Sequence, residues 1–173
     1  RTGPFVAGVM ISASHNPFQD NGIKVFGHSG YKLPDPQEHA IEADIFPLLE
    51  AGLTPSAATL VEDPGLDETY LGYLASTFPR KLDGLRIVVD CANGAATRLA
   101  PELLRRLGAE VLAIHCAPDG RNINLNCGAL HTEALARAVT AEGAKLGVAL
   151  DGDADRAIFV SAAGRLVDGD AVL

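Results

Sequence analysis

Residues 85–115 read LRIVVDCANGAATRLAPELLRRLGAEVLAIH and place a helical pattern between two apolar runs. The runs at 85–90 and 109–115 have the aliphatic, β-branched composition of buried strands. A turn signal, Asn93-Gly94, follows the first run, and leucines then recur at helical spacing until Gly108. This order predicts a βαβ unit with parallel strands.

The same alternation continues downstream. A helical pattern carries Leu135 and Val139, and further strands are expected at 144–150 and 157–161. An acidic loop separates these two strands. The alternation predicts an α/β fold, with layered α/β/α domains and mainly parallel, mixed sheets.

Upstream of residue 85 the signals are more varied. A buried strand is expected at 5–11 and a second strand at 22–26. A helix then begins at 35–38, where Asp35 would cap it and Glu38 would complete a capping box.

Residues 53–66, LTPSAATLVEDPGL, have the composition of a linker and indicate a domain boundary. Asp67 is expected to begin the next helix.

Composition excludes several classes of protein. The 173 residues carry a net charge of −8 and are 47% hydrophobic, so they can form a folded core. The negative charge disfavours nucleic acid and anionic membranes as partners, and no apolar run approaches the roughly 18 residues of a membrane span. Three widely spaced cysteines argue against a disulfide framework or a zinc site and favour reduced thiols in the cytoplasm.

The loop LDGDADRAIFV carries the strongest chemical signal. Asp151, Asp153 and Asp155 alternate directly after an apolar strand, and their mutual repulsion is relieved if a hard divalent cation binds. An EF-hand is excluded because its required Gly and Glu positions hold Arg156 and Ala162. The alternative is a solvated acidic hairpin tip.

A second polar stretch, SASHNP at residues 12–17, follows the first strand. Ser14 and His15 are neighbours, so on extended backbone their side chains would point apart, which disfavours a Ser-His-Asp hydrolase. Ser14 remains a candidate phosphoryl carrier, and a plain polar turn is the alternative. Lys24 follows on a short strand, where an ordinary solvated lysine is the alternative. His28, His39 and His115 belong to neither of these two groups of candidate functional residues.

Taken together, SASHNP and DGDADR resemble the phosphoserine loop and the metal loop of the α-D-phosphohexomutase family, in order and in separation. The resemblance implies that Ser14 carries a phosphoryl group. It also implies one Mg²⁺ ion shared by phosphorylated Ser14, Asp151, Asp153 and Asp155, and a contact between Arg156 and the phosphoryl group. Ser14 is therefore expected to lie near the acidic loop.

The same resemblance places His15, Asn16 and Lys24 beside the reacting groups, with His15 or Lys24 moving protons. NGIKVFGHSGYKL (21–33) and GRNINLNCGALH (120–131) resemble the branch of the family whose substrate is a phosphorylated hexosamine. Relatives acting on mannose or glucose phosphates are the alternative, and a metal-binding module without transferase activity is another. A haloacid-dehalogenase-type phosphatase is disfavoured because no early nucleophilic aspartate is evident.

The resemblance also implies a domain plan. Residues 1–60 would be the C-terminal part of a first domain, 61–167 a complete second domain, and 168–173 the start of a third. The chain is thus expected to be an internal fragment, inactive alone, of a cytoplasmic enzyme; whether the full-length protein is a homodimer is left open. Ala154 departs from the Gly often found in the metal loop and would need an unstrained φ.

Overall fold

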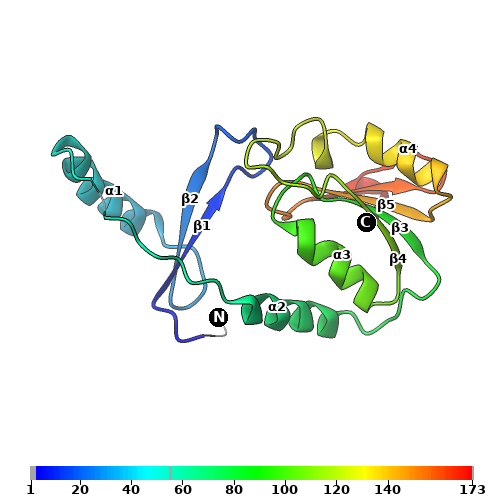
Figure 1. Cartoon of the computed structure of the whole chain (residues 1–173), viewed down its shortest axis with the longest axis horizontal. Coiled ribbons are helices and arrows are strands. Elements are labelled where there is room, and N and C mark those ends of the chain that lie inside the picture. Colours follow the sequence, from blue (N-terminus) through cyan, green and yellow to red (C-terminus); the bar gives the residue numbers. More distant parts are fainter. Residues whose placement is uncertain (1–2, 55, 173) are drawn as a thin grey trace. The chain divides into compact units, whose positions relative to one another are not determined.

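The unit predicted over residues 85–115 forms in the computed structural model of the chain (Figure 1). Strand β3 (Arg86–Asp90) leads to helix α3 (Ala96–Arg106) and then to strand β4 (Glu110–Ile114). The two strands pair in parallel, as expected. The structure describes residues 3–54 and 56–172.

The described chain divides into two compact units, which are taken in turn. One consists of Arg1–Ile11 and Gly22–Glu62; the other consists of Ser12–Asn21 and Asp63–Leu173. The segment with the candidate serine therefore belongs to the second unit, together with the acidic loop.

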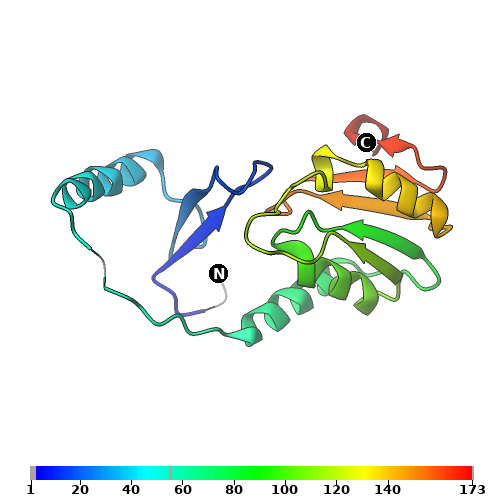
Figure 2. The same ribbon diagram turned by 45° about the horizontal axis from the view of Figure 1, so that its top comes forward.

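The second unit is built on a five-stranded sheet with the order β4-β3-β5-β6-β7. β5 (Leu146–Leu150) is parallel to β3, whereas β6 (Ala157–Ser161) and β7 (Leu166–Val167) continue the sheet antiparallel. The order can be followed in Figure 2 from the green strands to the red one. The predicted mixed α/β sheet is confirmed, and its parallel part is β4-β3-β5.

Helix α4 (Glu133–Ala141) covers one face of this sheet, and α3 lies on the other (Figure 1). The core under α4 is fully buried and contains Val88, Leu135, Val139 and Val160. The 3-10 turn η1 (Gly128–Leu130) precedes α4, and the short helix α5 (Gly169–Val172) follows β7. This core fixes the ends of β3 and β5, from which the candidate site extends.

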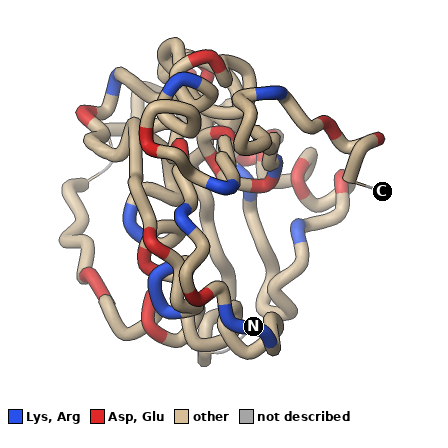
Figure 3. Tube along the Cα trace, turned by 90° about the vertical axis from the view of Figure 1, so that its right-hand side faces the viewer, with Lys and Arg blue, Asp and Glu red and all other residues tan. Residues whose placement is uncertain are grey.

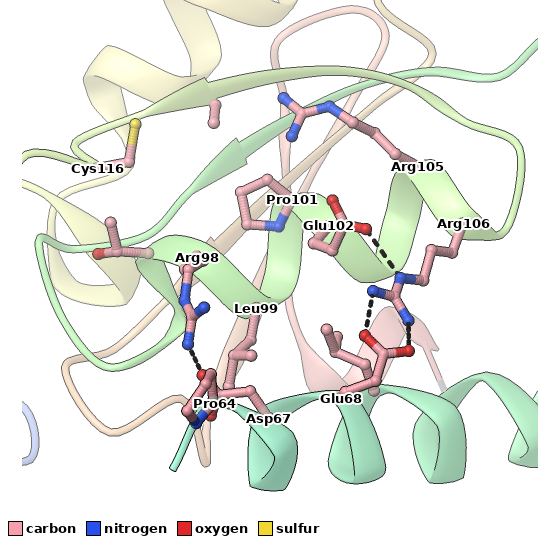
Figure 4. Close-up of a pocket in the computed structure, with 13 residues that line it drawn as sticks. Pro64, Asp67, Glu68, Arg98, Leu99, Pro101, Glu102, Arg105, Arg106 and Cys116 are labelled. Carbon is pink, nitrogen blue, oxygen red and sulfur yellow. Dashed lines mark hydrogen bonds and ion pairs between the residues drawn. The ribbon is translucent and has the colours of Figure 1, made fainter. Parts of the chain in front are cut away.

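Helix α2 (Pro64–Thr77) lies along α3 beside a cavity of about 520 Å³ (Figure 4). The guanidinium of Arg106 donates to both carboxylate oxygens of Glu68, at 2.6 and 2.7 Å, and to Glu102 at 2.8 Å. These bonds hold the pKa of Glu68 below its ordinary value. Arg98 pairs with Asp67 nearby. Charged side chains therefore line this cavity mainly as ion pairs between helices.

The expected start of this helix at Asp67 is wrong by one turn. Asp63 is the N-cap, and its carboxylate accepts a hydrogen bond from Gly65 N at 2.9 Å. Pro64 then occupies the first helical position, where its missing N–H costs nothing. The cap lies inside the stretch that composition assigned to a linker.

The first unit contains strands β1 (Ala7–Ser12) and β2 (Gly22–Gly27) and helix α1 (Asp35–Glu50). The expectation of a buried first strand is wrong, because Val9 and Ile11 are 67% and 73% exposed. In the described part of the chain β1 pairs only with β2, and a two-stranded sheet on its own buries few side chains.

The expected cap of α1 is also wrong. Pro34 is the N-cap and no side chain caps the helix, so Asp35 already lies within the first turn. There its negative charge still interacts favourably with the positive end of the helix dipole. Like β1, α1 buries no residue in the described part of the chain.

Acidic and basic residues are interspersed along the trace (Figure 3). Among the described residues, no helix is long and apolar enough to cross a membrane.

Candidate active site

The acidic loop begins where β5 ends. Asp151, Asp153 and Asp155 each offer a carboxylate oxygen, and these atoms all lie within 4.8 Å of one another. Asp151 is 1% exposed, and its Oδ1 accepts a hydrogen bond from the backbone N–H of Arg156 at 3.2 Å. Three carboxylates of graded exposure thus converge at one point of the loop.

The other carboxylate oxygen of Asp151, Oδ2, is buried and accepts no hydrogen bond from the described residues. Burial raises the pKa of Asp151, and the charges of Asp153 and Asp155 raise it further. A buried carboxylate oxygen without a donor is costly, and a cation bound among these oxygens removes that cost. An all-oxygen donor set suits a hard divalent ion such as Mg²⁺ or Ca²⁺, so the residues present fit such a cation.

The serine loop contacts this acidic loop directly. Gly152 N donates to Ser14 O at 3.0 Å, although the two residues are far apart in the sequence. The hydroxyl of Ser12 donates to Asp153 Oδ2 at 3.0 Å and accepts from Ser14 N at 2.9 Å. The expectation that Ser14 lies near the acidic loop is therefore confirmed.

Two glycines allow this close approach. A Cβ on Gly152 would lie 2.4 Å from Ser14 O, and a Cβ on Gly94 would lie 2.3 Å from Gly152 O. Real Cβ atoms do not approach so closely, so larger residues would push the segments apart. Ala95 N also donates to Gly152 O, at 2.8 Å, which ties the turn after β3 to the acidic loop.

His15 lies beside the candidate nucleophile. Its Nδ1 is 3.4 Å from Ser14 Oγ. The expectation that the two side chains point apart is wrong, because Ser14 has a φ of 51° and is not extended. A left-handed residue at Ser14 turns the chain so that neighbouring side chains meet. The contact gives the hydroxyl an adjacent imidazole, which is the usual partner of an activated oxygen nucleophile.

Asn124 holds the serine loop from a third segment. Its side-chain amide donates to Ser14 O at 2.8 Å and to Asn16 O at 2.9 Å. Its own backbone N–H donates to Ala92 O at 2.9 Å, which links it to the end of β3. Asn124 therefore spans the serine loop and the sheet.

The other predicted site residues are placed as follows. Arg156 follows the acidic loop with a side chain 58% exposed, and its Nε is 3.9 Å from Asp155 Oδ1. Asn16 closes the turn of the serine loop by donating its N–H to Ala13 O at 2.8 Å. Lys24 lies on β2 in the other compact unit and lines a cavity of about 580 Å³ with residues of α1.

Ala154 does not have the unstrained backbone that was expected. Its φ is +60°, in the left-handed region that glycine adopts without cost. The acidic loop therefore holds a strained alanine between two of its three carboxylates.

Sequence reasoning missed Ser12 and Asn124. The signal for Ser12 was available, since a serine two residues before an N–H in a turn commonly accepts from it. Asn124 had no such signal, because its partners lie more than a hundred residues away. The stretch 120–131, which entered the sequence analysis only as a resemblance to one branch of the family, thus supplies a contact to the serine loop.

Two domain descriptions of one known family match the chain. Residues 68–164 match the family described as phosphoglucomutase/phosphomannomutase, alpha/beta/alpha domain II. Residues 1–51 match the description phosphoglucomutase/phosphomannomutase, alpha/beta/alpha domain I. The acidic loop falls in the domain II match and the serine loop in the domain I match.

Individual relatives carry related names. The chain is 62% identical over 173 residues to a phosphoglucosamine mutase of Solibacter usitatus, and 52% identical over 172 residues to one of a Geobacter species. These matches cover 100% and 96% of the chain but 39% and 38% of the relatives, so the chain spans under two fifths of their length.

A solved structure of a phosphoglucomutase/phosphomannomutase family protein from Burkholderia thailandensis superimposes with a TM-score of 0.71. The sequences are 26% identical, and the match covers 95% of this chain and 35% of that one.

Proposed function

Because the chain belongs to the phosphoglucomutase/phosphomannomutase family, we propose that it supplies the phosphoryl-transfer centre of a hexosephosphate mutase. In this proposal Ser14 carries the phosphoryl group. The reaction interconverts glucosamine 6-phosphate and glucosamine 1-phosphate, as suggested by the names of the relatives with 52–62% identity.

One observation carries the proposal: the serine loop is hydrogen-bonded to a loop of three carboxylates, and the buried oxygen Asp151 Oδ2 in that loop has no donor among the described residues. A phosphorylated serine is strongly anionic and would be repelled by these carboxylates unless a cation lay between them. Asp151, Asp153, Asp155 and the phosphoserine would hold one Mg²⁺ ion. When bound, Mg²⁺ offsets the charge of the phosphoryl oxygens during transfer.

The residues of the chain have distinct parts in the transfer. The bond from phosphorus to Ser14 Oγ breaks as a bond to O1 of glucosamine 6-phosphate forms, so the sugar hydroxyl loses a proton and Ser14 gains one. We assign the proton at Ser14 to His15, whose Nδ1 is 3.4 Å away. The bisphosphorylated sugar then turns around and returns its 6-phosphoryl group to Ser14.

Positioning is assigned to three further groups. The Asn124 amide and the Ser12 hydroxyl fix the backbone of the serine loop against the acidic loop, which orders the nucleophile before substrate binds. Arg156 is exposed and cationic at the edge of the acidic loop, where it would contact the phosphoryl group. Asn16 and Lys24 complete the proposed set, and His15 or Lys24 takes the proton that the sugar hydroxyl loses.

We propose a domain plan in which residues 1–60 belong to domain I, 61–167 form domain II and 168–173 begin domain III. The linker composition at 53–66 and the two family matches support the first boundary. The three cysteines are free, which suits a reducing compartment, and we propose the cytoplasm as the location.

The test is a phosphoryl-group assay on the full-length protein that contains this chain. Incubation with glucosamine 1,6-bisphosphate should add one phosphate to the protein by intact mass, and Ser14→Ala should abolish it. Ser29→Ala, which removes a serine outside the site, is the matched control. Mutase turnover with glucosamine phosphates should disappear with the same variant. A phosphate that remains in Ser14→Ala would refute the assignment of the carrier.

The second part of the test uses mannose and glucose phosphates as substrates. If the full-length protein turns these over faster than the glucosamine phosphates, the enzyme class stands and the proposed sugar is wrong. If no phosphate is taken up but Mg²⁺ binds, the chain is a metal-binding module without transferase activity.

A further inference from the structure

A second group of potential ligands lies at the ends of neighbouring strands, outside the acidic loop. Asp90 ends β3, His115 follows β4, and Cys127 precedes the turn η1. Each offers one ligand atom, and the three atoms lie within 4.8 Å of one another. We call these three residues the mixed-donor cluster. It is assembled entirely within the second compact unit.

Two of the three potential ligands are almost completely buried. Asp90 is fully buried and Cys127 is 1% exposed. Asp90 Oδ1 accepts from Ala92 N at 2.9 Å, and Asp90 Oδ2 lies 2.9 Å from His115 Nδ1. A buried carboxylate needs a hydrogen-bond donor or a cation, and the contact with the His115 ring is one such partner for Asp90.

A cation from solvent can reach the cluster. The His115 side chain is 31% exposed, so one edge of the cluster is open to solvent. Zn²⁺ binding at this position would displace the proton of the Cys127 thiol. The side-chain amide of Asn93 lies 3.8 Å from Cys127 Sγ and steadies the sulfur.

The chemistry of the donors selects the metal. Carboxylate oxygen, imidazole nitrogen and thiolate sulfur are the three donors that Zn²⁺ accepts in proteins, commonly three from the chain with water in the fourth position. Mg²⁺ and Ca²⁺ avoid sulfur and prefer oxygen. We propose that Asp90, His115 and Cys127 form a zinc site, separate from the acidic loop and its hard cation.

Zinc at this cluster would also affect the loop that holds the serine segment. His115 and Cys127 bracket residues 116–126, which include Asn124. A metal shared with Asp90 would tie both ends of this loop to the end of β3. The zinc proposal itself does not depend on the proposed mutase activity, since it rests on the three ligands alone.

Cobalt spectroscopy on the 173-residue chain tests the site. The chain is first reduced and saturated with Mg²⁺, which occupies the acidic loop, and one equivalent of Co²⁺ is then added. We expect a thiolate-to-cobalt charge-transfer band and the intense visible bands of four-coordinate cobalt, both removed by Zn²⁺. Cobalt held only by the oxygens of the acidic loop would show no thiolate band.

Single variants identify the ligands. Cys127→Ser and His115→Ala should each abolish the thiolate band or its four-coordinate pattern, whereas Cys116→Ser, which changes an exposed thiol beside His115, should leave both unchanged. Circular dichroism confirms that each variant is folded. Thermal unfolding gives a second readout: Zn²⁺ should raise the midpoint of the original chain and of Cys116→Ser, but not of His115→Ala.

Three results would overturn the proposal. They are no thiolate band in the original chain, a thiolate band that survives Cys127→Ser or a four-coordinate pattern that survives His115→Ala, and a band lost only in Cys116→Ser. In the first case Asp90 and His115 form a structural hydrogen-bonded pair, and in the last case the exposed thiol binds metal adventitiously.

Discussion

The acidic loop and the mixed-donor cluster both follow the carboxyl ends of adjacent parallel strands, yet they are built differently. The acidic loop takes its three carboxylates from five consecutive residues, 151–155. The mixed-donor cluster takes its donors from three elements, and its members are 25 and 12 residues apart along the chain. One is a local feature of the sequence, and the other exists only after the sheet has formed.

The difference shows what a parallel sheet contributes. Asp90 of β3 pairs in register with Ala149 of β5, so the residues that follow both strands emerge at the same edge. This edge also receives the serine loop through Ser14 O and Gly152 N. Donors of different hardness can therefore lie close together while still selecting different metals.

The largest expected effect comes from Asp151→Asn. Asparagine keeps the shape of the buried side chain but removes the charge, so Mg²⁺ affinity should fall by more than about 100-fold, since even outer-shell partners of a metal are worth roughly 10–100-fold. Isothermal titration measures this. The cobalt thiolate signal of the mixed-donor cluster should not change.

Asp44→Asn is the matched control, because it removes an equal charge from an exposed position on α1. It should leave Mg²⁺ affinity unaltered. If Asp151→Asn removes both metal signals, the two clusters are one site and the comparison fails.

Acidification should separate the acidic loop from ordinary surface carboxylates. Because the pKa of Asp151 is raised, it takes up a proton at a higher pH than an exposed aspartate, and Mg²⁺ affinity should fall about tenfold per pH unit below that pKa. Acidification has the opposite effect on the stability of the metal-free protein, which it raises. A raised acid pKa means that stability is greatest below the unfolded-state pKa and is lost as the pH rises through the folded-state value.

Chemical unfolding in EDTA at several pH values measures this loss. Asp151→Asn cannot ionise at this position and should not show it. Equal pH dependence of the two proteins would contradict the assigned cause, which is the burial of Asp151.

Asn124→Asp tests the support of the serine loop. The substitution is isosteric but replaces the donor to Ser14 O and Asn16 O with an acceptor, so two hydrogen bonds are lost. The rate of phosphoryl uptake by Ser14 in the full-length protein should fall about tenfold. Stopped-time intact-mass analysis measures the rate, and Mg²⁺ affinity should stay the same.

Asn126→Asp is a close control, because Asn126 has the same left-handed backbone but is exposed. It should react at the original rate. Equal slowing in both variants would mean that negative charge in the loop, rather than the lost bonds, is responsible.

The smallest expected effect is a gain. Ala154→Gly removes the strain of a left-handed alanine, offset in part by the greater freedom of glycine in the unfolded chain, and should stabilise the chain by roughly 0.5–1 kcal/mol. Urea unfolding measures it. A loss of stability would show that the alanine methyl group contributes packing that outweighs the strain.

Much of the fold could be read from the sequence because strand and helix periods are local. The βαβ unit at 85–115, the strand at 157–161 and the acidic loop all appeared where they were expected. The burial of β1 could not be predicted, since an apolar pattern shows which residues can be buried but not whether another layer covers them. The start of α2 was missed because the Asp63 cap lies inside a stretch of linker-like composition.

The sequence by itself determined the donors of the acidic loop and the turn chemistry around Ser14, since both depend on residues a few positions apart. Only the tertiary structure decided which segments meet. It turned Ser14 into the left-handed region beside His15, and it placed the Asn124 amide on two carbonyls of the serine loop. It also gathered Asp90, His115 and Cys127 at one strand edge. The physical reason is that long-range contacts depend on the register of parallel strands and on loop closure, and no short stretch of sequence encodes either.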